Sequence, residues 1–120
     1  MPDAYHRIDA DPLRAFAEEL FLAAGTPPDI AKRVAEIVIR ADLSGHHSHG
    51  MFRVIGYMSA LERGHLVADA RPEILDEKPG AASVDGKRGW GHYAAQWSMD
   101  LAIRKAKETG IACVSLRNYS

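Results

Sequence analysis

Apolar residues recur every three or four positions through the first half of the chain, and this spacing predicts three amphipathic helices. The expected helices cover Asp11–Ala24, the stretch from Thr26–Asp29 to Ala41, and Ser48–Arg63. Prolines near the first two helix starts and a glycine after each helix mark their ends. The positions expected to face the core are Leu13, Phe16, Ala17, Leu20 and Ala24, then Ile30, Val34, Ile37, Val38 and Ala41, then Met51, Val54, Ile55, Met58 and Leu61.

The pattern changes after Gly64, where short apolar stretches bounded by proline and glycine predict strands. Strands are expected at Pro72–Asp76, Ala81–Asp85 and Ile111–Leu116, with a helix over His92–Glu108 between the last two. That helix is expected to turn Ala95, Met99, Ala102, Ile103 and Ala106 inward. A strand, a helix and a buried strand form a βαβ-like unit. The sequence therefore predicts an α/β protein, with a helical segment at 1–70 and an α/β segment at 71–120.

Composition excludes several classes of partner. The 120 residues carry 15 Lys and Arg against 16 Asp and Glu, and this net charge of −1 gives no attraction for nucleic acid or an anionic membrane. With 47% hydrophobic and 26% charged residues, the composition is that of a globular domain, and no apolar run is long enough to cross a bilayer. The single cysteine, Cys113, is expected to be a buried apolar residue in a reducing compartment, and the cytoplasm is the expected location.

The densest chemistry lies in Ser44–Arg53, which holds three of the six histidines. At about 100° per residue in a continuous helix, Arg53 falls about 40° and Tyr57 about 80° from His49, away from the apolar stripe. Ser48 is expected to cap the free N–H groups, and the helix dipole favours neutral His49. The guanidinium of Arg53 suits a carboxylate, and His49 is then placed to exchange a proton with an adjacent carbonyl or imine. This pattern predicts a receptor for a small 2-oxo or 2-imino acid.

Two other interpretations of this segment stay open on the residues alone. A polar face opposite an apolar stripe is typical of any surface helix, so simple exposure to solvent also explains it. A cluster formed by His46, His47 and His49 is, alternatively, the kind of group that binds zinc and related metals. Asp42 is the only carboxylate close to this cluster in the sequence, and we therefore expect no metal site.

A glycine-rich turn, Asp85–Gly91, lies between a predicted strand and a predicted helix, the setting in which backbone N–H groups cradle a phosphate. Its spacing is G-x-x-G-x-G, whereas the dinucleotide fingerprint is G-x-G-x-x-G. We therefore expect these glycines to serve the turn or close packing, and we expect no ordinary Rossmann site. The aromatic residues Trp90, Tyr93 and Trp97 are expected to pack at the edge of a core.

Four motifs follow one another along the chain. They are Ala-Asp-Leu-Ser-Gly at 41–45, Ser-His-Gly-x-x-Arg at 48–53 with Tyr57 and Gly64 behind it, Val-Asp-Gly-x-x-Gly-x-Gly at 84–91, and Val-x-x-Arg-Asn at 114–118. In this order they resemble the amino-terminal part of the malate/L-lactate dehydrogenase family. This type-2 family also holds sulfolactate, ureidoglycolate and diketogulonate dehydrogenases and cyclic imino-acid reductases. The resemblance extends over nearly the whole chain.

The resemblance implies a homodimeric oxidoreductase that uses NAD or NADP, with a non-Rossmann, mixed-sheet NAD(P)-binding domain that begins in this chain. Its substrate is then a small 2-hydroxy, 2-oxo or cyclic imino acid. By resemblance, His49 is the catalytic residue that exchanges the proton, Arg53 holds the substrate carboxylate, and Ser48 is a supporting substrate contact. The cofactor-binding residues are expected mostly beyond residue 120.

Two departures from the family pattern shape these expectations. Family members are longer and continue Arg-Asn-Ser-x-His-x-Gly, whereas Tyr119 stands here in place of the usual serine and the sequence ends at Ser120. The chain is therefore expected to be an amino-terminal fragment that is inactive alone, with a sheet that other segments or a partner chain cover. A non-catalytic dimerisation or regulatory module is the alternative function that the same features allow.

Overall fold

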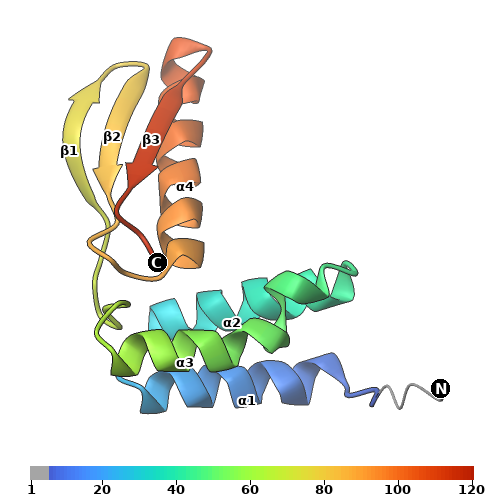
Figure 1. The fold of residues 1–120 in the computed structure, drawn as a ribbon. Helices are drawn as coiled ribbons and strands as arrows, with labels where there is room; N and C mark the ends of the chain where they lie inside the picture. The colour runs from blue at the N-terminus through green and yellow to red at the C-terminus, as the bar shows by residue number, and fades with distance from the viewer. Residues whose placement is uncertain (1–5) are drawn as a thin grey trace.

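The structure is a computed structural model that describes residues 6–120, and it has two parts set at an angle to each other (Figure 1). The first part is a layer of three helices, α1 (Ala10–Ala23), α2 (Pro28–Leu43) and α3 (Val54–Glu62), with two short 3-10 turns, η1 (His47–His49) and η2 (Met51–Arg53), before α3. The second part stands on this layer and holds β1 (Glu73–Lys78), β2 (Ala81–Asp85), α4 (Gly91–Thr109) and β3 (Cys113–Arg117). The division into domains at residues 70 and 71 stays a prediction.

The sheet is mixed. β1 pairs antiparallel with β2, and β2 pairs parallel with β3, so that Val84 lies between Ile74 and Leu116. The crossover from β2 to β3 runs through α4, which packs against the sheet through Leu101. The predicted α/β fold, with a helical segment followed by a mixed sheet, is confirmed.

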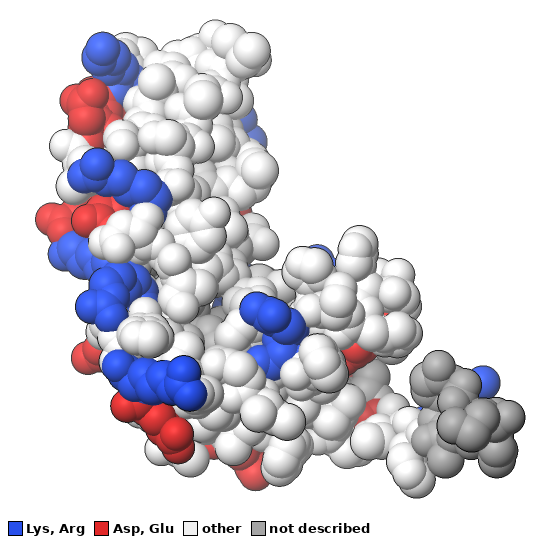
Figure 2. All heavy atoms as spheres, in the orientation of Figure 1, with Lys and Arg blue, Asp and Glu red and all other residues white. Residues whose placement is uncertain are grey.

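Within residues 6–120, β1 and β3 are the two edges of this sheet. The β1 edge is charged: Glu73 pairs with Lys87, and Glu77 pairs with Lys105 at 2.7 Å. Figure 2 shows Lys, Arg, Asp and Glu gathered along the side of the molecule that β1 occupies. The Lys105 side chain is only 9% exposed, and its Nζ also donates to the Lys78 carbonyl at 2.8 Å. These two contacts attach α4 to the hairpin formed by β1 and β2.

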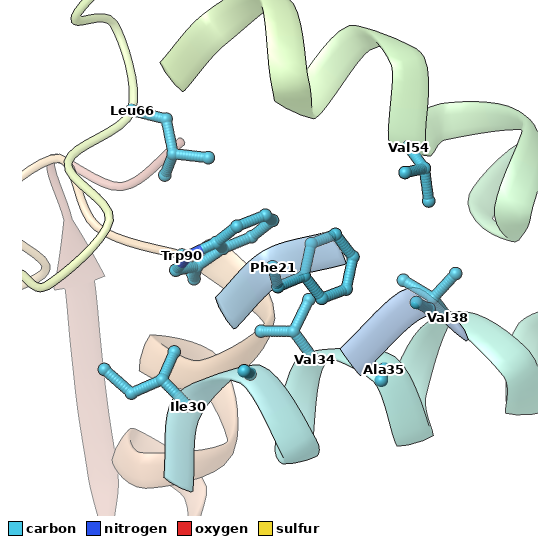
Figure 3. Packing of buried hydrophobic residues seen from close by; sticks show 10 residues of the cluster. Phe21, Ile30, Val34, Ala35, Val38, Val54, Leu66 and Trp90 are labelled. Carbon is cyan, nitrogen blue, oxygen red and sulfur yellow. The ribbon is translucent and has the colours of Figure 1, made fainter. Parts of the chain in front are cut away.

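The core of the helical layer is built around Trp90, which enters it from the start of α4 (Figure 3). Trp90 is 2% exposed, and its ring lies 4.9 Å from Phe21 of α1 and 5.6 Å from Tyr57 of α3. Its indole N–H donates to Thr26 Oγ1 at 3.1 Å, so the polar atom of this buried side chain is satisfied. The other buried members of the cluster are Ala17, Ile30, Ala31, Val34, Ala35, Val38, Val54 and Leu66.

A polar contact on the surface also joins the helical layer to the part of the fold that holds the sheet. Both terminal nitrogens of Arg71, just before β1, donate to the Asp29 carboxylate at 2.8 Å. This bidentate bond holds the pKa of Asp29 at about 2, well below its usual value. The connection into the sheet is therefore attached to the start of α2.

The predicted inward face of the helix after β2 is wrong. Ala95, Met99 and Ile103 are exposed, whereas the side of α4 that is buried carries Ala94, Ser98, Leu101 and Lys105. The helix is apolar on more than one side, so periodicity alone did not select the side that meets the sheet. A buried lysine and a buried serine also weaken the apolar signal of the true side.

Three other expectations about the core are also corrected. Phe16 is 56% exposed, and Phe21 is the α1 aromatic residue that is buried. Ile55 is 81% exposed because α3 begins only at Val54 and turns Val54 and Met58 inward. Cys113 is exposed, because alternation along β3 directs Val114 toward α4 and places Cys113 on the sheet face that residues 6–120 leave uncovered.

No helix among residues 6–120 combines the length and the apolar run that crossing a bilayer requires.

Replacing the junction side chain tests its role in stability. Trp90→Ala is expected to lower the free energy of unfolding by about 3–5 kcal/mol, because it opens a cavity that three helices line. Phe16→Ala removes an exposed aromatic ring and is expected to cost less than about 1 kcal/mol. Urea unfolding followed by circular dichroism measures both. Equal losses for the two variants would contradict the central position of Trp90.

Candidate active site

The segment that carries Ser48, His49 and Arg53 is not the single helix expected over 48–63. The chain makes the turn η1, passes through an extended Gly50 with φ −92° and ψ −150°, makes the turn η2, and enters α3 at Val54. His49 therefore lies outside any α-helix, and the angular positions and helix dipole assumed for it do not apply. The expected cap by Ser48 is also absent among the contacts of the described residues.

A carboxylate at the end of α2 fixes this irregular path. Asp42 Oδ2 accepts a hydrogen bond from the Met51 backbone N–H at 2.8 Å, and Asp42 Oδ1 lies 3.0 Å from His47 Nδ1. A Cβ added at Gly50 would overlap the Asp42 carboxylate. Gly50 and Asp42 thus fit together as a pair, and the backbone from 47 to 51 folds around the acid instead of continuing a helix.

Ser48 and His49 contact each other within η1. Ser48 Oγ lies 3.0 Å from His49 Nδ1, and the ring of His49 meets the edge of the His46 ring at 5.3 Å between centroids. His49 borders a shallow hollow of about 350 Å³ with Arg40 and Ser44 of the α2 end. The second nitrogen of His49, Nε2, has no hydrogen-bond partner among the described residues.

Arg53 and Tyr57 lie together, as predicted, and a third group joins them. Arg53 Cζ lies 5.8 Å from the centre of the Tyr57 ring, and Tyr57 Oη lies 3.3 Å from His92 Nε2. Arg53 and Tyr57 line a hollow of about 430 Å³ that Ser120 also borders. Sequence reasoning missed His92, which is 35 positions from Tyr57 and comes near it only because α4 begins beside the helical layer.

Burial lowers the pKa of His92 below its usual value, and electrostatic interactions with His49 and Arg53 lower it further. Both side chains therefore lie within electrostatic reach of this imidazole. The structure does not, however, place His49 and Arg53 in one hollow, because His49 borders the first and Arg53 the second.

The three clustered histidines do not converge as metal ligands. His47 turns to Asp42, whereas His46 and His49 meet edge to face. No group of three or more His, Cys, Asp or Glu side chains among residues 6–120 has an arrangement that holds a metal ion.

The glycine-rich turn is filled by the end of the chain. The N–H groups of Gly86, Arg88 and Gly91 donate to the carbonyls of Arg117, Asn118 and Ser120 at 2.7–2.9 Å. Positive φ angles of 52° and 59° at Lys87 and Arg88 form a type I′ turn closed by the Gly89 N–H to the Gly86 carbonyl. The predicted turn with close packing is confirmed. These donors are already used, so this turn does not fit the phosphates of a dinucleotide.

The features to compare with known proteins are a loop that presents Ser48 and His49, an exposed Arg53 four positions later, and a helical layer joined to a mixed sheet. The sequence profile of malate/L-lactate dehydrogenase matches residues 8–120. The chain belongs to the malate/L-lactate dehydrogenase family, as its motifs predicted.

Individual relatives agree with this assignment. Hydroxycarboxylate dehydrogenase B of Escherichia coli strain K12 is 38% identical over 113 residues, which cover 94% of this chain and 31% of the relative. Delta(1)-pyrroline-2-carboxylate/Delta(1)-piperideine-2-carboxylate reductase of Pseudomonas syringae pv. tomato is 35% identical over 98 residues, 82% of this chain and 29% of the relative. The solved malate dehydrogenase of Pyrococcus horikoshii OT3 superposes with a TM-score of 0.94 at 36% identity, over 98% of this chain and 34% of that one. The chain thus spans about a third of the length of these relatives.

The pairing of Gly50 with Asp42 has a measurable consequence. Gly50→Ala is expected to lower the free energy of unfolding by about 1–3 kcal/mol, because the new methyl group displaces the Asp42 carboxylate. Gly56→Ala is the matched control: it lies in α3 with open space around its Cβ position and is expected to stabilise by about 0.5–1 kcal/mol. Thermal and urea unfolding distinguish the two. A Gly50→Ala variant as stable as Gly56→Ala would rule out the clash.

The lowered pKa of His92 predicts a pH dependence of stability. Unfolded histidine has a pKa of about 6.5, so below that pH the unfolded chain binds a proton that folded His92 does not. The contribution of His92 to the free energy of unfolding is therefore fully present above about pH 6.5. It is lost as the pH falls toward the lower pKa that His92 has in the folded protein. His92→Gln is therefore expected to lose less stability than the unmodified protein between pH 7 and pH 5, measured by urea unfolding. Parallel losses in both proteins would contradict a lowered pKa.

Proposed function

We propose that the protein is an NAD(P)-dependent oxidoreductase that interconverts small 2-hydroxy and 2-oxo acids, or reduces cyclic imino acids, and that this chain forms the substrate side of its active site. The observation that carries the proposal is the hydrogen bond between Ser48 Oγ and His49 Nδ1, followed four positions later in the chain by Arg53, whose side chain has no carboxylate partner among residues 6–120. Family membership and the names of the relatives support the same chemistry.

His49 is the proposed proton donor and acceptor. Ser48 Oγ is in position to accept a hydrogen bond from Nδ1–H, which keeps a proton on Nδ1 and leaves Nε2 to exchange a proton with the substrate. When the carbonyl or imine carbon is reduced, its oxygen or nitrogen takes a proton from Nε2 of the imidazolium form of His49, which is left neutral. In the oxidation of a 2-hydroxy acid, the unprotonated Nε2 of neutral His49 takes up the hydroxyl proton. Ser48 supports both directions because it fixes the imidazole ring.

Arg53 is the proposed carboxylate-binding residue. Its guanidinium offers two parallel N–H donors, which match the two oxygens of a carboxylate. Its exposed position at the end of η2, above the Tyr57 ring, leaves those donors available. Every candidate substrate carries a carboxylate beside the reacting carbon, so a residue that binds this group also places that carbon.

The nicotinamide of NAD or NADP supplies or accepts the hydride when it is bound. The glycine-rich turn of this chain does not fit its phosphates, and we propose that most cofactor-binding residues belong to the part of the family's length that lies beyond residue 120. A homodimer is the assembly we propose on the same family grounds. The exposed thiol of Cys113 suits a reducing compartment, which supports the cytoplasm as the location.

Kinetics of two variants in the complete protein test these roles. Arg53→Lys loses the bidentate geometry and is expected to raise KM for the acid at least about tenfold. His49→Ala is expected to lower kcat by about 10²–10⁴-fold with a smaller change in KM. Arg33→Lys, which alters an exposed pair with Glu36, is the matched control. The assay follows NAD(P)H oxidation with a panel of 2-oxo and cyclic imino acids.

Unchanged kinetics in both variants would refute the proposed roles. A complete protein that oxidises NAD(P)H with no member of the panel would favour the non-catalytic dimerisation or regulatory module instead.

A further inference from the structure

His92 is a half-buried histidine that the proposed reaction does not use. Its imidazole meets the Tyr57 ring edge to face at 5.2 Å between centroids and lies 6.5 Å from the ring of Trp90. Its only hydrogen bond among the described residues joins Nε2 to Tyr57 Oη at 3.3 Å. His92 Nδ1 is buried and has no partner in residues 6–120.

These contacts favour one form of the imidazole. Burial, together with the charge of Arg53, lowers the pKa of His92 and favours the neutral ring. A buried N–H without an acceptor is costlier than an acceptor without a donor, so Nδ1 is best left unprotonated. Nε2 then carries the proton and donates to Tyr57 Oη. The uncharged ring fixes the tyrosine and does not compete with Arg53 for an acid.

Tyr57 is held from several sides, and Arg53 is not. The Tyr57 ring has Trp90 at 5.6 Å in an edge-to-face contact and His92 at its hydroxyl. Arg53 has no hydrogen bond from its side chain to residues 6–120, and its one recorded contact with a ring is the 5.8 Å approach to Tyr57. The orientation of the guanidinium therefore depends on where the Tyr57 ring lies.

We propose that His92 is a positioning residue for substrate binding: it fixes the hydroxyl of Tyr57, and the Tyr57 ring in turn orients the Arg53 guanidinium toward the acid. This inference rests on the proposed function, because it takes Arg53 as the group that binds the carboxylate. It adds a residue that comes from the other part of the fold, so the start of α4 helps to shape the substrate site.

The test measures binding of oxalate, an unreactive planar mimic of a 2-oxo acid, to the complete protein. Tryptophan fluorescence reports it, since Trp90 touches Tyr57. His92→Leu and Tyr57→Phe each break the hydrogen bond and are expected to raise the oxalate Kd about tenfold, which is about 1.4 kcal/mol. The double variant is expected to be no weaker than either single one, because both act through the same bond. His92→Gln, whose amide can donate to Tyr57, is expected to stay within about threefold of the unmodified protein.

Kinetics and a matched control separate positioning from a purely structural role. With a 2-oxo acid as substrate, His92→Leu and Tyr57→Phe are expected to raise KM and leave kcat within about threefold. Tyr93→Phe removes a neighbouring hydroxyl that accepts a hydrogen bond from Arg71 at 3.3 Å, and it is expected to change neither Kd nor KM. Thermal unfolding checks each variant. If His92→Leu does not fold, Tyr57→Phe, which keeps the whole ring, carries the test.

The outcomes separate this proposal from the function on which it rests. Arg53→Lys is measured in the same assay: if it leaves oxalate binding unchanged, the proposed role of Arg53 fails and this inference fails with it. If Arg53→Lys weakens binding and Tyr57→Phe does not, only the positioning role is overturned. Additive losses in the double variant would also overturn it, since His92 and Tyr57 would then act separately.

Discussion

The insertion of Trp90 into the helical layer is the interaction on which the rest of the structure depends. The indole leaves the second part of the fold and ends among α1, α2 and α3, where Thr26 satisfies its only polar atom. Gly91 and His92 follow directly, so a seated indole also fixes where α4 begins. The Gly91 N–H is held by the Ser120 carbonyl, which brings the segment after β3 to the same corner. Trp90 therefore joins the two parts of the fold, together with the Arg71–Asp29 ion pair and the contact of Tyr57 with His92.

The side chains of the candidate site are positioned by two kinds of contact, one between residues close in the sequence and one between residues far apart in it. Ser48 and His49 depend on the loop that Asp42 organises, and every contact that shapes this loop lies within ten positions. Arg53 depends on Tyr57, whose surroundings come from the start of α4. His49 and Arg53 thus depend on different contacts, one within the helical layer and one that reaches α4. A movement between the two parts of the fold would disturb the contact of Tyr57 with His92 and leave the loop at Asp42 intact.

Sequence patterns were informative where one interaction dominates. Apolar positions repeated every three or four residues located α1 and α2, and Pro28 stands at the start of α2 as its position suggested. The prediction of Asp11 as the helix cap, with Pro12 as the first helical residue, is wrong: α1 begins at Ala10, its cap position is Asp9, and Asp11 lies in the first turn. The turn glycines were also assigned correctly: carbonyls of residues 117–120 occupy the space that side chains would need at Gly86 and Gly91, and Ala70 occupies it at Gly89.

Sequence patterns did not predict the structure where a side chain, instead of a backbone carbonyl, binds a backbone N–H. They also failed where the contacting residues are far apart in the sequence. Apolar spacing cannot show that the Asp42 carboxylate binds the Met51 N–H, so the break at Gly50 was missed and a continuous helix was expected. The two apolar sides of α4 gave no basis for a choice between them. The pairing of Tyr57 with His92 has no local signal at all, since it exists only once Trp90 is buried.

The unequal edges of the sheet affect how the protein associates with extended chains. A foreign strand that approached β1 would have to strip water from a row of ionised side chains, including the pairs made by Glu73 and Glu77. Among the described residues, a strand that approached β3 meets Val114, Ser115 and Leu116, which carry no charge, and Arg117 at the end of the strand. Edge-to-edge aggregation in both directions needs two receptive edges, and ionised side chains make β1 the less receptive one. Within residues 6–120, the addition of a further strand is therefore disfavoured at β1.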